Sequence, residues 1–78
     1  MNKKDCLNLI IKALRDHDQR RSSLDPQTAY QDGVATCTAC ERMCKDAGYE
    51  RPVFLQLWSR ACDQIARETH VRPSEVRA

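Results

Sequence analysis

The segment from Asp25 to Gly48 carries both a start signal and a stop signal for a helix, and no other feature constrains the fold as much. Asp25 is a suitable N-cap, because its carboxylate can accept a hydrogen bond from a backbone N–H in the first turn. Pro26 suits the first helical position, where no N–H is needed. Gly48 suits the left-handed position that follows a helix. The sequence therefore predicts a helix over residues 26–47.

Two further segments have the apolar periodicity of helices. The first covers residues 4–20, with Asn2 as its expected N-cap, and the second covers residues 52–70, ending before Pro73. No window alternates apolar and polar residues as a half-buried strand does. We therefore predict an all-α fold, a single domain of three antiparallel helices joined by short loops.

The length and composition of the chain restrict its class. With 78 residues it buries only about 60% of its unfolded surface, so its own core is marginal. The domain is expected to cover residues 1–78, with a flexible tail at residues 72–78. No stretch approaches the roughly 20 apolar residues of a membrane span, and the segment after Lys3 and Lys4 lacks the cleavage site of a signal peptide. We expect a cytoplasmic protein without membrane association.

Three of the five cysteines share one face of the middle predicted helix, at Cys37, Cys40 and Cys44. The interpretation we favour is that they are core residues, since a free buried cysteine behaves as a small apolar side chain. In an alternative, Cys40 and Cys44 offer two thiolates to Cu(I) or Zn, and Cys62, Cys6 or a histidine completes the site. Their Cys-x-x-x-Cys spacing is similar to that on the inward faces of helical copper-storage bundles, which carry far more cysteines. A disulfide or redox role is a third possibility.

No residue pattern indicates catalysis, and no cofactor is expected. A nucleophilic cysteine needs a base and an orienting group within reach, and no histidine is paired locally with a cysteine. His17 lies near the end of the first predicted helix, where the helix dipole favours a cation. Its neighbours Asp16 and Asp18 point in other directions. We therefore predict a protein that is not an enzyme.

A basic face on the first predicted helix raises the possibility of nucleic-acid binding. It comprises Lys4, Lys12 and Arg15, with Arg20 and Arg21 beyond. The net charge of +2 is too small to imply a polyanionic partner by itself. A solvated surface is the simpler interpretation, and a nucleic-acid-binding dimer is our third hypothesis for function.

The first and third predicted helices have apolar arcs of roughly 200°, wider than a lone three-helix domain needs. The surplus predicts association, and a symmetric homodimer is the commonest solution. We expect the interface at Leu7, Ile11, Phe54 and Trp58. The sequence thus favours a small helical regulator or inhibitor that dimerises and binds another protein, of unknown identity.

Overall fold

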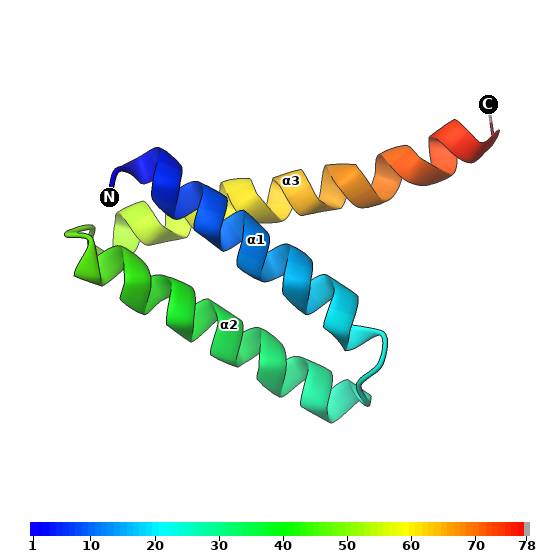
Figure 1. Cartoon of the computed structure of the whole chain (residues 1–78), viewed down its shortest axis with the longest axis horizontal. Coiled ribbons are helices and arrows are strands. Elements are labelled where there is room, and N and C mark those ends of the chain that lie inside the picture. The colour runs from blue at the N-terminus through cyan, green and yellow to red at the C-terminus, as the bar shows by residue number, and fades with distance from the viewer. Residues whose placement is uncertain (78) are drawn as a thin grey trace.

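Three helices form the chain in the computed structural model, which describes the backbone of residues 1–77 and the side chains of residues 1–68. Helix α1 spans Lys3–Arg21, α2 spans Pro26–Asp46 and α3 spans Arg51–Arg77 (Figure 1). No strand occurs within residues 1–77. The predicted all-α class with three helices is therefore confirmed.

The first two helices begin at the caps that the sequence predicts. The Oδ1 atom of Asn2 accepts a hydrogen bond of 2.8 Å from the backbone N–H of Asp5. The Oδ1 atom of Asp25 accepts one of 2.9 Å from the N–H of Thr28. Each cap satisfies a donor that the first turn of a helix leaves without an intrahelical partner.

Gly48 ends α2 in the left-handed conformation, with φ of 92°. The N–H of Gly48 donates to the carbonyl oxygen of Lys45 at 3.0 Å, and the N–H of Tyr49 donates to that of Cys44 at 2.9 Å. These two bonds form a Schellman motif, which requires a residue with positive φ at this position. The motif turns the chain sharply, so that α3 begins at Arg51.

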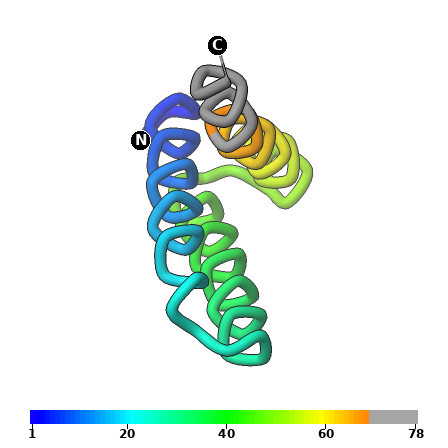
Figure 2. The backbone as a smooth tube through the Cα atoms, turned by 90° about the vertical axis from the view of Figure 1, so that its right-hand side faces the viewer, coloured from blue at the N-terminus to red at the C-terminus, as the bar shows by residue number. Residues whose placement is uncertain are grey.

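The arrangement of the helices differs from a simple antiparallel bundle. Helices α1 and α2 form an antiparallel hairpin, whereas α3 crosses this hairpin obliquely (Figures 1 and 2). Helix α3 packs mainly against α1 and less against α2. The prediction of antiparallel neighbours is therefore correct for the first pair only. The wide apolar arc of α1 explains the difference, since it can contact both other helices.

Helix α3 is longer than the sequence predicts. It extends to Arg77, whereas the stop signal at Pro73 predicts an end near residue 70. A proline removes one intrahelical hydrogen bond and can be accommodated within a helix, so it is a weaker stop signal than Gly48. The expected flexible tail, residues 72–78, lies outside the residues whose side chains are described.

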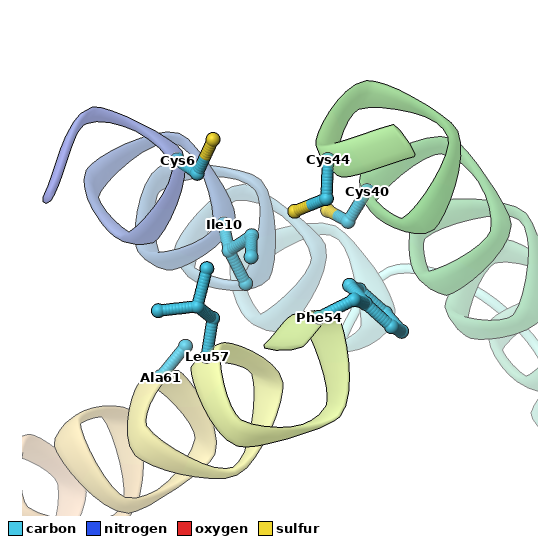
Figure 3. Packing of buried hydrophobic residues seen from close by; sticks show 7 residues of the cluster. All are labelled: Cys6, Ile10, Cys40, Cys44, Phe54, Leu57 and Ala61. Carbon is cyan, nitrogen blue, oxygen red and sulfur yellow. The ribbon is translucent and has the colours of Figure 1, made fainter. Parts of the chain in front are cut away.

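The core lies at one end of the hairpin, where α3 crosses it (Figure 3). Phe54 from α3 is the largest fully buried side chain, and its ring centroid lies 5.8 Å from that of Trp58. All three helices contribute buried side chains, namely Cys6 and Ile10, Cys40 and Cys44, and Phe54, Leu57 and Ala61. We call this region the closed end. The opposite end, residues 17–34, is called the hairpin tip and contains no fully buried residue.

Candidate functional site

The structure divides the cysteines into two groups. Cys40 and Cys44 are buried in the closed end together with Cys6 and Ile10 of α1, and their side chains point from α2 towards α1 (Figure 3). Cys37 is half-buried and Cys62 is exposed. Of the four predicted metal ligands, Cys37, Cys40, Cys44 and Cys62, Cys37 is close enough to Cys40 and to Cys62 to raise the pKa of each. Within residues 1–68, no three His, Cys, Asp or Glu side chains form a group that could hold a metal ion.

The buried thiols are kept in their protonated form. Burial, with smaller contributions from the nearby Cys37 and Cys44, raises the pKa of Cys40 to about 11. Burial is also the main cause of the raised pKa of Cys44, followed by the neighbouring Cys6. The thiol of Cys6 donates to the Sδ atom of Met1 at 3.6 Å. Since only the thiolate is an effective nucleophile or metal ligand, these positions suit the role of core side chains.

The four predicted interface residues are buried or half-buried rather than exposed. Phe54 is only 1% exposed, so the expectation that it is exposed in a single chain is wrong. Leu7, Ile11 and Trp58 are half-buried and pack against the core. The broad arcs of α1 and α3 mainly cover each other, because α3 crosses α1 directly. The apolar side chains that stay exposed lie on other faces of the helices.

A polar network that sequence reasoning missed joins α1 to α2 at the hairpin tip. The Oδ2 atom of Asp32 lies 2.6 Å from Nδ1 of His17 and 2.9 Å from Nη2 of Arg20. The hydrogen bond with His17 is the main cause of the lowered pKa of Asp32, and the bonds from Arg20 add to it. One carboxylate therefore connects two α1 side chains to α2.

Gly33 lies beneath the imidazole ring of this network. A Cβ atom at Gly33 would stand 3.4 Å from Nε2 and 3.5 Å from Cε1 of His17. These are ordinary contact distances, so the ring lies over Gly33 but leaves room for an alanine there.

The basic face of α1 is partly neutralised by carboxylates. Arg15 makes two hydrogen bonds to Glu68 of α3, of 2.7 and 3.3 Å. Arg20 is bound to Asp32, and Arg21 lies 3.1 Å from Asp18. These arginines stabilise contacts within the chain, which weakens the case for a phosphate-binding surface.

The exposed large apolar side chains include two neighbours on α2 at the hairpin tip. Tyr30 is 73% exposed and Val34 is 49% exposed. They line a surface groove of about 440 Å³ between α1 and α2. Its lining also contains Arg21, His17, Pro26, Ala29, Gly33 and Cys37. This groove is the candidate binding site that the fold leaves open.

Comparison of the chain with protein-family models, curated proteins and solved structures gave no match. The site is therefore interpreted from its own chemistry. Within the described residues, no helix combines the length and apolar character that crossing a membrane requires.

Proposed function

We propose that this chain is a non-catalytic helical protein that acts by binding other protein chains, in the first place a second copy of itself. The observation that carries the proposal is the pair of exposed apolar side chains at the hairpin tip, Tyr30 at 73% and Val34 at 49% exposure, which stand beside a surface groove.

The chemistry of the described side chains supports a binding role. Burial keeps the thiols of Cys40 and Cys44 protonated, so they are poor nucleophiles. The imidazole Nδ1 of His17 is occupied by Asp32. By contrast, the hairpin tip offers exposed apolar groups beside a groove, which is the usual character of a surface that binds protein. These features suit a cytoplasmic regulator or inhibitor of another protein.

The mass in solution tests the proposal. Light scattering at micromolar concentration should give about twice the 9.0 kDa of one chain. Because apolar burial depends weakly on salt while exposed ion pairs are screened, the mass should persist at high salt. A mass of one chain at the highest attainable concentration would contradict self-association and remove the basis of the proposal.

A further inference from the structure

The first four turns of α2 are nearly free of charge. Between Pro26 and Cys40 the single charged residue is Asp32, although 31% of the whole chain is charged. The carboxylate of Asp32 is held by His17 and Arg20 and is thus neutralised within the chain. The exposed side chains of this segment are Pro26, Gln27, Thr28, Tyr30, Gln31, Val34, Ala35, Thr38 and Ala39. We call this surface the uncharged face of α2.

An uncharged exposed face is unusual for a helix at the surface of such a polar chain. Solvated helices normally carry charged residues on the face away from the core. The middle of a protein interface is instead depleted of charged residues and enriched in aromatic ones such as tyrosine. Tyr30, at 73% exposure, and Val34, at 49%, provide the apolar centre of the face. The face therefore has the composition of an interface rather than of a solvated surface.

We infer that the uncharged face of α2 is the surface on which a second copy of this chain docks, with the two α2 helices paired across a two-fold axis. This inference rests on the proposed function and names the surface through which the chain would self-associate. In a two-fold interface the same patch meets itself, so a charge close to the axis would face its own copy. The uncharged face avoids this repulsion.

The other helices are less suited to self-pairing. The exposed side of α1 carries charges of both signs, namely Lys3, Lys4, Asp5, Lys12 and Asp16. The exposed side of α3 carries Arg60, Asp63 and Arg67. Since charged residues are depleted from the middle of a protein interface, α2 is the helix best suited to self-contact.

The groove beside the uncharged face provides room for a partner side chain. It measures about 440 Å³ and is lined largely by small or apolar residues, Gly33, Ala29 and Val34 among them. A tyrosine ring is a rigid, largely apolar group with a polar tip, which makes it effective at interfaces. We assign this groove to the Tyr30 side chain of the second copy, so that the two grooves are filled reciprocally.

Opposite charges placed at Val34 test the inference. Val34→Glu and Val34→Lys should each raise the dissociation constant of the homodimer at least about 100-fold, because each brings like charges together at the centre of the interface. An equimolar mixture of the two variants should regain the dimer, since Glu then faces Lys. Light scattering of each variant and of the mixture gives the readout. Circular dichroism should show unchanged helicity, because Val34 is half-exposed in one chain.

Leu55 on α3 provides the matched control, because its exposure of 47% is close to that of Val34. Leu55→Glu should leave the dimer intact. If the Val34 variants stay dimeric while Leu55→Glu dissociates, the inference is overturned but the proposed self-association stands. If both Val34 variants are monomeric and their mixture stays monomeric, two-fold pairing through this residue is also overturned. If the wild-type chain is monomeric, self-association fails, and with it the docking surface inferred here.

Discussion

The two halves of α2 show how one apolar stripe can serve two purposes. In the C-terminal half, Cys40 and Cys44 are buried in the closed end, where all three helices meet. In the N-terminal half, the same stripe continues to Tyr30, which is among the most exposed apolar side chains. The difference arises because α3 crosses the hairpin at one end only (Figure 1). Periodicity therefore identifies which face of a helix is apolar, and the crossing helix decides which part of that face is covered.

The largest change in stability is expected when one aromatic side chain is removed from each end of the molecule. Phe54→Ala should lower the free energy of unfolding by about 3–5 kcal/mol, because it leaves a cavity among fully buried side chains. Tyr30→Ala should change it by less than about 0.5 kcal/mol, the usual size for an exposed position. Urea unfolding measures both.

Both substitutions are best made in the Val34→Glu background, in which dissociation does not contribute to the measured stability. Comparable losses from Phe54→Ala and Tyr30→Ala would show that the hairpin tip is packed as tightly as the closed end. The contrast between the two halves of α2 would then be lost.

Alkaline pH provides a second test, directed at the closed end. The pKa of Cys40 is raised from 9.0 to about 11 in the folded chain, so between these values the folded state retains a proton that the unfolded state has released. Stability should therefore fall as pH rises from 9 towards 11, by about 1.4 kcal/mol for each pH unit at most. Urea unfolding across this range measures the slope.

Cys40→Ala is the control for that slope. It should cost about 1 kcal/mol at neutral pH, because a small buried group is lost, and it should flatten the alkaline decline relative to the wild type. Cys40→Ser should cost more, since a buried hydroxyl needs a hydrogen-bond partner. An identical alkaline slope in Cys40→Ala and wild type would show that this thiol does not titrate as its burial requires.

The smallest expected effect concerns the network at the hairpin tip. Asp32→Asn removes the carboxylate that connects His17 and Arg20 to α2. Amide hydrogen exchange should accelerate in residues 26–34, because local opening of the tip becomes easier, and remain unchanged around Cys44. Uniform acceleration along α2 would instead show that the helix opens as one unit.

Acidification should reproduce the effect of Asp32→Asn. The pKa of Asp32 is lowered from 3.8 by its hydrogen bonds with His17 and Arg20. A lowered carboxyl pKa stabilises the folded state above the ordinary value, and this contribution is lost as pH falls below it. Protection factors at the tip, which correct for the intrinsic pH dependence of amide exchange, should therefore fall on acidification below about pH 4 in the wild type, and much less in Asp32→Asn.

Much of the fold follows from local sequence signals. Asn2, Asp25 and Gly48 act through hydrogen bonds to residues a few positions away, so the sequence is sufficient to place these helix ends. The oblique crossing of α3 depends instead on which apolar arcs meet in space. The sequence records the width of those arcs but not the angle at which they pack, and this is why Phe54 was expected on a surface.

The candidate site is harder to predict for the same reason. His17 and Asp32 are separated by 15 positions and meet only because the hairpin aligns them. No sequence motif with a fixed spacing identifies such a pair. The uncharged face of α2 is different, because the absence of charge between Pro26 and Cys40, apart from Asp32, is visible in the sequence itself. Local charge density would have identified it.

The order of the helices, with α3 after α1 and α2, affects how the protein folds during synthesis. Three of the seven core side chains, Phe54, Leu57 and Ala61, belong to this last helix. A domain folds as a unit, and α3 is synthesised after the α1–α2 segment. Ile10 and Cys44 therefore stay without their full packing partners until α3 leaves the ribosome. The partly synthesised chain exposes both its future core and its uncharged face, and the completion of α3 covers the core.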